Sequence, residues 1–515
     1  MPQAGLLELV AHGVQDVYLI GNPQITFFKT IYKRHTNFSM EAFQISYDAK
    51  PTWGQRTTFN ITRYADLMYT MIVEIDIPQL RSVYTFDNEW TGVGKSPTDF
   101  NTPESVGTIS WVNNTGHAAV LYYDLKIGGQ LIDRQYSEWM EIWTQLSQSE
   151  SKKRGLDQLL NRNYNLETTS VAQTLYIPLQ FWFCRNIGLA LPLIALQYHD
   201  VELELNFRPL AQMTTFGSNL YYSATSNDSN ILTLTNLYDG IPALQNSDIQ
   251  GRIIVFPDGA QYYIAPDATI NPGQDGSLAD PYTITMVRTI PDIALNIPKY
   301  NNATVYIKPN GVLDTSYNTD IVEVRLYVDY IYLDTIEQRE FANAKHRYLI
   351  EQLQYSGSES IDVNATTKRV KLVFNLPIKE IFWVNQLDSV YTINDLFNYS
   401  NSIAASVPPD NIISSAQLTI NGIERFSIRN ADYFRLIQPY QKHTRSPNGF
   451  FYVYSFSVKP EEHQPSGCSN FSKLDTKELF LNIKPNTGLQ QVRVYAINYN
   501  ILRIMSGMGG VAFSS

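Results

Sequence analysis

Cysteine is almost absent from this 515-residue chain, which contains only Cys184 and Cys468. No disulfide framework can support the fold, and the sequence favours a reducing compartment. Charged residues are also few, at 17%, so neutral polar side chains must cover much of the surface. The formal net charge of -10 argues against a general nucleic-acid coat, because such proteins need a basic face to displace phosphate counterions. We therefore expect no direct contact with nucleic acid.

Long hydrophobic runs and catalytic motifs are missing as well. Met1 to Val10 lacks a basic region followed by a long apolar run, and no later stretch has about 18 consecutive uncharged apolar residues. We expect a soluble protein that is not secreted. The chain has no glycine loop ending in GKS or GKT, no HExxH, no GxSxG and no CxxC. These absences favour a protein that is not an enzyme and that uses no catalytic residue, metal or cofactor.

Tyrosine and phenylalanine are abundant, with 34 and 24 residues, and the clearest pattern is an alternation of apolar and polar residues. Aromatic and β-branched residues suit a pleated, half-buried surface. Alternation with a period of two predicts strands with one buried face. Such strands are expected at 43–47, 73–77, 201–207, 322–332, 370–374, 452–458 and 492–496. The expected fold class is all-β.

Helical patterns are few and short. Pro23 could begin a helix with an apolar stripe, formed by Ile25, Phe28, Ile31 and Tyr32. Residues 136–146 place apolar side chains at the i, i+3, i+4, i+7 spacing of a second helix. A third helix is expected from Thr335, which matches the capping-box spacing with Gln338. Because this third helix lies between two β-rich halves, we interpret it as a connector.

Two short motifs occur once in each half of the chain, which indicates a duplicated fold. Leu125 to Gly129 resembles Leu418 to Gly422, and in each a strand runs into the Gly-Gly or Asn-Gly pair of a two-residue hairpin. Val324 to Val328 resembles Val492 to Ala496, and each segment closes its half. About eight short strands per half fit two tandem jelly-roll β-barrels. On pattern alone, other β-sandwiches fit nearly as well, and so short a repeat can also arise by chance.

Extra sequence separates the two motifs of the first half. Residues from about 211 to 320 are rich in Asn, Ser, Thr, Asp, Gly and Pro and contain short apolar runs such as Ile253 to Phe256. This composition predicts a polar, β-rich excursion from a loop between strands. Such excursions lie on the surface.

Several longer segments resemble the major capsid proteins of nucleocytoplasmic large DNA viruses. The most specific is DVYLIGNPQITFFKTIYKRHTNF, from Asp16 to Phe38. The others are TLYIPLQFWFCRNIGLALPLIALQYHDVEL from Thr174, DYIYLDTIEQREFANAKHRYLIEQLQ from Asp329, KPEEHQPSGCSNFS from Lys459, and the tail 494–506. The resemblance is weakest over about 80–113 and 211–320, where the family's loops vary, so the roles of these two insertions stay open.

The resemblance implies a fold, an assembly and a set of partners. The fold is two tandem eight-stranded jelly-roll β-barrels with short helices and long surface-loop insertions. The assembly is a homotrimer of pseudo-hexagonal outline that, with neighbouring trimers, tiles the icosahedral shell of a large double-stranded DNA virus. Further implied partners are minor capsid and penton proteins, and the resemblance also allows proximity to an internal membrane and surface glycans. The protein would be assembled in the host cytoplasm and reside in the virion capsid.

The expected organisation combines the resemblance with the repeat. Residues 1–24 form an N-terminal arm on the inner face of the shell, and residues 25–335 form the first jelly roll, which includes the insertion at about 211–320. Residues 336–347 are the helical connector. Residues 348–515 form the second jelly roll and the C-terminal tail. The last residues, from Met505 to Ser515, are expected either to order only against another subunit or to fray.

A basic cluster near the N-terminus is the one candidate site, and it consists of Lys29, Lys33, Arg34 and His35. This cluster could face the interior of the shell and meet acidic minor capsid proteins or lipid headgroups. The plainer interpretation is a short helix whose charged side is solvated or paired with carboxylates.

Two carboxylate clusters have plainer interpretations. Glu461, Glu462 and His463 offer metal-ligand or acid/base chemistry, but nearby prolines favour a fixed loop packed against a neighbour. Glu202 and Glu204 could suggest glycoside hydrolysis, although their spacing fits the solvated face of one strand. The alternative function is therefore a carbohydrate-binding or carbohydrate-cleaving β-sandwich protein, which a glycan array and a hydrolysis screen would reveal.

Overall fold

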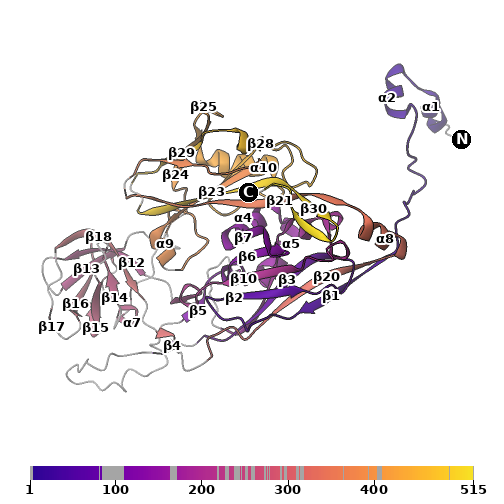
Figure 1. Cartoon of the computed structure of the whole chain (residues 1–515). Helices are drawn as coiled ribbons and strands as arrows, with labels where there is room; N and C mark the ends of the chain where they lie inside the picture. The colour runs from indigo at the N-terminus through magenta and orange to yellow at the C-terminus, as the bar shows by residue number, and fades with distance from the viewer. Residues whose placement is uncertain are drawn as a thin grey trace.

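Two β-barrels and a smaller β-rich unit make up the computed structural model (Figure 1). Their strands are antiparallel and their helices are short, so the all-β, double jelly-roll expectation is confirmed. The structure describes residues 4–80, 82–83, 109–162, 171–216, 220–226, 231–236, 244, 246–249, 253–256, 261–271, 274, 276–277, 279–289, 293–294, 299–308, 312–313, 318–363, 365–392, 394–402, 409–485 and 488–513.

The first barrel consists of two packed sheets. One sheet has the order β1-β20-β3-β8 and the other has the order β2-β10-β6-β7. Alternation explains the packing, because Val73 and Ile75 of β3 point into the core while Glu74 and Asp76 point away from it. The bounds are β1 (Phe38–Ile45), β2 (Arg56–Ile61), β3 (Leu67–Ile77), β6 (Val120–Ile127), β7 (Gln130–Tyr136), β8 (Gln173–Pro178), β10 (Val201–Phe207) and β20 (Glu323–Leu333), with β9 (Leu191–Pro192) attached to β3.

The second barrel repeats this topology strand for strand. Its sheets have the orders β21-β30-β23-β27 and β22-β29-β24-β25. It has its own core, which includes Trp383, Phe434 and Tyr452. The bounds are β21 (His346–Ile361), β22 (Thr367–Lys371), β23 (Pro377–Leu387), β24 (Ile413–Ile420), β25 (Ile423–Glu424), β26 (Arg429–Asn430), β27 (Phe451–Ser455), β28 (Ser469–Asn470), β29 (Lys477–Ile483), β30 (Gln490–Met505) and β31 (Met508–Val511).

The internal repeat predicted from the sequence is confirmed at both motifs. Each hairpin motif forms a two-residue turn, with φ angles of 55° and 76° at Gly128 and Gly129 and of 51° and 77° at Asn421 and Gly422. Both central residues have positive φ, as a type I′ turn requires, which is why these positions carry Gly or Asn. The closing motifs occupy the same place in the two barrels, the central strands β20 and β30.

The register of the central strands is also duplicated. Tyr327 lies opposite Ile72 in the first barrel, and Tyr495 lies opposite Phe382 in the second. Both ladders contain an irregularity at the same place, after which Met68 faces Tyr330 and Ile378 faces Asn498. Because a change of register by one residue would move every side chain to the other face of the sheet, equivalent positions in the two barrels can be compared side chain by side chain.

The helices lie between the strands, and two of the three predicted ones are confirmed. The helix predicted at 136–146 is α4, and the helix predicted from Thr335 is α8. The bounds are α3 (Thr115–Ala119), α4 (Ser137–Ser147), α5 (Glu150–Leu159), α6 (Trp182–Arg185), η4 (Ile187–Leu189), η5 (Leu193–Ala195), η6 (Leu210–Gln212), α8 (Thr335–Asn343), α9 (Asp388–Thr392), the π-helix η7 (Tyr433–Ile437), α10 (Gln438–Lys442) and η8 (Phe471–Lys473).

Two details of the helix predictions are wrong. No helix begins at Pro23, because residues 23–37 contain only a turn and their side chains are exposed; a short helix is marginal in water without a surface to pack against. Helices occur earlier instead, as α1 (Ala4–Val10), η1 (Val14–Asp16) and α2 (Val17–Ile20). At α8 the N-cap is Asp334, and the Gln338 side chain donates to Asp66 Oδ1 at 2.8 Å rather than closing a capping box at Thr335.

The excursion at about 211–320 is a folded unit with a core of its own. Tyr222, Leu234, Ile254, Tyr282 and Ile307 are among its buried residues. Its main sheet has the order β13-β12-β18-β14-β15-β16-β17. The bounds are β12 (Leu220–Ser226), β13 (Ile231–Asn236), α7 (Asn246–Ile249), β14 (Ile253–Val255), β15 (Gln261–Ile270), β16 (Tyr282–Thr289), β17 (Ile293–Ala294) and β18 (Tyr300–Lys308), and two small ladders join β11 (Thr214–Phe216) to β5 (Ile109–Trp111) and β19 (Val312–Leu313) to β4 (Ser82–Val83).

The C-terminal residues are ordered within their own chain, so both expectations for this segment are wrong up to residue 513. β31 folds back on β30 and forms a hairpin whose turn meets the first barrel. There, the Tyr198 N–H donates to the Gly507 carbonyl oxygen at 2.9 Å. A Cβ at Gly509 would lie 2.6 Å from Leu196, so the absent side chain permits this close contact.

Candidate assembly surfaces

The two barrels of one chain adhere through α4. Four aromatic or aliphatic side chains of this helix pack on the outer face of the sheet that contains β23, β27 and β30. They are Trp139, Ile142, Trp143 and Leu146. The alternation of 452–458 predicts one buried face for β27, but both faces are buried, because α4 covers the outward residues Phe451 and Val453.

The opposing face of the second barrel is apolar throughout this contact. Its residues are almost completely buried and comprise Phe382, Val384, Phe451, Val453, Tyr495 and Ile497. The ring centroids of Trp139 and Phe382 are 5.0 Å apart in an edge-to-face arrangement that favours aromatic pairs. This contact between the two barrels, called the internal joint below, therefore consists of buried apolar side chains and resembles a protein core.

One partly buried carboxylate fixes the orientation of α4 on the second barrel. Glu138 forms an ion pair with Arg493 and accepts a hydrogen bond from the Tyr495 hydroxyl. Arg493 also donates to Gln386. Burial and the adjacent Glu138 carboxylate raise the pKa of Tyr495 well above its ordinary value, so this phenol remains protonated.

A histidine between two carboxylates closes one side of the same joint. His443 Nε2 lies 3.1 Å from Glu380 Oε1, and His443 Nδ1 lies 2.9 Å from Glu461 Oε1. Burial disfavours the charged imidazolium, but the two carboxylates outweigh burial and raise the pKa of His443 to about 9. The His443 ring also packs edge-on against Trp143 of α4, with centroids 6.4 Å apart.

The acidic loop after Lys459 is held by contacts within its own chain. Glu461 accepts hydrogen bonds from Thr444 as well as from His443, and Glu462 pairs with Lys459 at 2.7 Å. No group of three or more metal-ligating side chains occurs among the residues that the structure describes. The fixed, packed loop is the interpretation that these contacts support.

Glu204 of β10 forms structural ion pairs. Glu204 is 3.4 Å from Arg56 NH1 and also bonds Lys126, so its carboxylate binds cations of the two neighbouring strands. Cys184 packs against the core of the first barrel, and burial raises the pKa of its thiol to about 12. Neither group is poised for hydrolysis.

The N-terminal segment stands away from both barrels (Figure 1). None of the residues of α1 or α2 is buried. Exposure of its large apolar side chains runs from 54% for Ile20 to 98% for Phe28. The basic cluster Lys29, Lys33, Arg34 and His35 lies in this exposed stretch and outside any helix. So many exposed apolar side chains in one segment mark an interaction surface.

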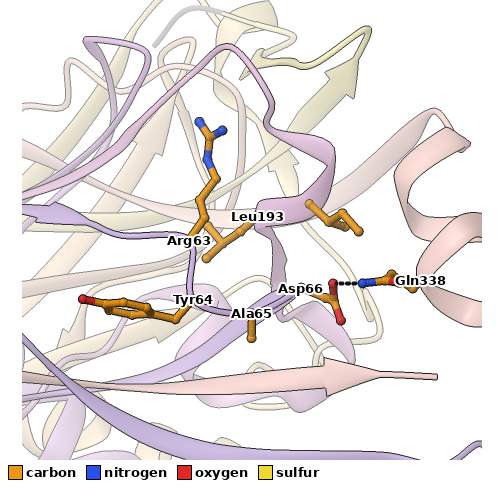
Figure 2. A pocket seen from close by; sticks show the side chains of 7 residues that line it. Arg63, Tyr64, Ala65, Asp66, Leu193 and Gln338 are labelled. Atoms are coloured by element: carbon orange, nitrogen blue, oxygen red, sulfur yellow. Dashed lines mark hydrogen bonds between the residues drawn. The ribbon is translucent and has the colours of Figure 1, made fainter. Parts of the chain in front are cut away.

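A shallow pocket lies beside the root of this segment (Figure 2). Its cavity volume is about 340 Å³, and it is lined by Arg63, Tyr64, Ala65, Asp66, Leu193, Ile194 and Gln338. Asp66 already accepts hydrogen bonds from the Leu333 N–H and from Gln338, at 2.9 and 2.8 Å. Arg63 is paired with Asp200 at 2.9 Å. Asp66 joins the barrel to α8, and both polar groups are engaged within the chain.

No helix in the described part of the chain has both the length and the apolar character needed to span a membrane. Sequence reasoning correctly identified α4 but missed its partners. The signal was present at the start of this strand, where the outward residues Phe451 and Val453 are as apolar as the inward Tyr452 and Tyr454.

Comparisons with known proteins match both halves of the chain to viral major capsid proteins. Residues 26–240 match a family described as the N-terminus of the major capsid protein, and residues 337–510 match the family of large eukaryotic DNA virus major capsid proteins. The major capsid protein of Pyramimonas orientalis virus is 34% identical over 99% of both chains. That of Paramecium bursaria Chlorella virus 1 is 30% identical, also over 99% of both.

Solved structures give the same result. A chain of the PBCV-1 virus capsid, in a quasi-atomic model, has a TM-score of 0.62 and 25% identity, and the match covers 95% of this chain and 100% of that one. The Faustovirus major capsid protein has a TM-score of 0.61 at 11% identity, with 96% and 94% covered, which supports the fold.

Proposed function

Because this chain belongs to the family of large eukaryotic DNA virus major capsid proteins, we propose that three copies form a pseudo-hexagonal capsomer that tiles an icosahedral shell. The chain is a structural component of a virion capsid and not an enzyme. The observation that carries the trimer is the duplicated barrel with one repeated topology and register. Three copies of a two-barrel chain supply six equivalent units, and a heterologous contact between such units closes into a ring.

The mass of the purified protein tests this proposal. Light scattering coupled to size-exclusion chromatography should give a particle of three 58.7 kDa chains, and electron microscopy should show a hexagonal outline with threefold symmetry. A stable monomer at micromolar concentration would overturn the trimer. The carbohydrate-binding or carbohydrate-cleaving alternative is not favoured, because relatives and structural neighbours alike are capsid proteins.

We further propose that the N-terminal segment lies on the inner face of the shell, where it meets minor capsid proteins, penton proteins or the headgroups of an internal membrane. Two features support this role: the exposed apolar side chains of residues 4–32 and the adjacent cations Lys29, Lys33 and Arg34. Neighbouring trimers and surface glycans complete the proposed set of partners, and assembly takes place in the host cytoplasm.

Reversing the three charges of the arm tests its role separately from trimer formation. A chain with Lys29→Glu, Lys33→Glu and Arg34→Glu should form capsomers of normal mass, because these side chains contact neither barrel. Recombinant particles made with it should contain fewer minor proteins or less lipid. Normal particle composition would contradict the inner-face role.

A further inference from the structure

The second barrel carries a helix equivalent to α4 whose outward side chains Leu436, Ile437 and Tyr440 are exposed in the part of the chain that the structure describes. In both barrels a helix follows the strand that pairs with the hairpin strand. In the first barrel it follows Tyr136, the end of β7, which pairs with β6; in the second it follows Asn430, the end of β26, which pairs with β24. Its residues run from Ala431 through η7 and α10 to Lys442. Counted from the first helical residue, four positions of α4 pack on the other barrel, namely the third, sixth, seventh and tenth. The same positions in the second helix are occupied by Tyr433, Leu436, Ile437 and Tyr440.

The exposure of these side chains differs sharply from that of their counterparts. Trp139, Ile142, Trp143 and Leu146 are at most 3% exposed, whereas Leu436, Ile437 and Tyr440 are 40, 46 and 81% exposed. The fourth residue of each helix has the same role in both barrels: Met140 of α4 points into the first core, and Phe434 points into the second. The helix is therefore anchored to its own barrel in the same way. Tyr433 is partly buried against the second core, and Leu436, Ile437 and Tyr440, in and after the π-helical turn, face solvent.

The equivalent receiving face lies on the first barrel. The shared register places Ile72, Tyr176, Pro178 and Tyr327 where the second barrel has Phe382, Phe451, Val453 and Tyr495. These four residues are only partly buried. They lie on the outer face of the β1-β20-β3-β8 sheet, which no described helix covers at the position that α4 occupies on the second barrel.

The polar anchor of the internal joint is also duplicated. By the same register, Arg325 and Tyr327 are equivalent to Arg493 and Tyr495, and Asp76 is equivalent to Gln386. Arg325 pairs with Asp76 at 3.0 Å, as Arg493 donates to Gln386. The second residue of each helix is acidic, Glu138 in α4 and Asp432 in the other. The Asp432 side chain is 53% exposed, and its Oδ1 lies 3.8 Å from Arg435 and accepts a hydrogen bond from Asn411 at 2.9 Å.

We propose that the helix face of Tyr433, Leu436, Ile437 and Tyr440 docks on the outer face of the β1-β20-β3-β8 sheet of a second copy of this chain, with Asp432 meeting Arg325 and Tyr327 there. The occupant is a second copy because the receiving face and the docking face each lie at positions equivalent to one half of a contact that the chain already makes with itself. This inference rests on the proposed trimer and names the surfaces that build it. A heterologous contact of this kind, repeated around an axis, leaves neither face uncovered.

A matched pair of variants tests the docking face. Ile437→Asp places a charge on it, and Ile423→Asp makes the same change at a 73% exposed position of the neighbouring hairpin. Both isoleucines are solvent-exposed, so both variants should fold like the wild type. Analytical ultracentrifugation should show a trimer for Ile423→Asp and at least about 30-fold weaker association for Ile437→Asp, as for a central interface residue.

Chemical crosslinking tests the pairing of the two faces. In the internal joint Trp139 meets Phe382, and the equivalent residues are Tyr433 and Ile72. In a Cys468→Ser background, chains with Tyr433→Cys mixed and reassembled with chains carrying Ile72→Cys should form covalent dimers with a short bismaleimide. Either variant alone should not.

The possible results separate the two proposals. A trimer that is unchanged by Ile437→Asp, or that forms no crosslink between positions 433 and 72, would overturn this contact and leave the capsomer standing. A wild-type protein that remains monomeric would overturn both. Loss of the trimer only in Ile437→Asp, together with the crosslink, is the result that we expect.

Discussion

Alkaline pH should weaken the second barrel through a single histidine. His443 lies between the Glu380 and Glu461 carboxylates, and its pKa is raised to about 9 from an ordinary value of 6.5. A group whose pKa is raised on folding stabilises the folded state fully below its unfolded pKa, and this contribution disappears as the pH rises through the folded value. The difference between the two pKa values corresponds to a contribution of about 3 kcal/mol from His443 to the free energy of unfolding. The loss should therefore occur between about pH 6.5 and about pH 9.

The variant His443→Gln isolates this contribution, because glutamine keeps hydrogen-bonding groups and removes the charge. Thermal unfolding of both proteins should be followed by tryptophan fluorescence at about pH 6, 8 and 10. The advantage of the wild type over the variant should be largest at the lowest pH and absent at the highest. Other groups that titrate in alkali affect both proteins alike and cancel in the difference. A difference that stays constant over this range would refute the reasoning.

Three further predictions concern the joint, the turns and the insertion. Glu138→Gln leaves Arg493 buried with a neutral partner and should lower the free energy of unfolding by about 3 kcal/mol in chemical denaturation; a loss below about 1 kcal/mol would show that the pair is dispensable. Gly422→Ala, at φ +77°, should destabilise by about 1 kcal/mol, whereas Gly155→Ala in α5 should stabilise by about as much, and equal effects would contradict the backbone argument. Replacing residues 220–308 by a short linker should preserve the trimer in light scattering, because the ends of this unit pair as neighbouring strands; loss of folding would place the unit in a barrel core.

The repeat could be predicted from the sequence because local chemistry determines it. The Gly-Gly and Asn-Gly turns need positive φ at two successive residues, and few other pairs satisfy that need. The alternation in 73–77 and 201–207 marks strands because each has one apolar and one polar face. The duplicated topology follows from these elements once they occur in the same order in both halves.

The helix at Pro23 and the joint between the barrels depend on partners that are distant in sequence. Ile25 and Phe28 have the spacing of a helix, but both are exposed among the described residues, and the segment contains only a turn. Conversely, Phe451 and Val453 lie where alternation predicts polar residues for an exposed face, and α4 accounts for the difference. The equivalence of Glu138 and Asp432 becomes visible only when the register of both barrels is known.

The two outer sheet faces differ in chemistry, although the barrels share one plan. Where the second barrel has Val384 under α4, the first barrel has Glu74, which pairs with Arg325. Apolar contacts persist at high salt concentration, whereas ion pairs weaken as the Debye length decreases. High salt should accordingly dissociate the chains from one another at a concentration that leaves the two barrels of each chain together. A shell of such capsomers would then disassemble and reassemble without unfolding of its chains.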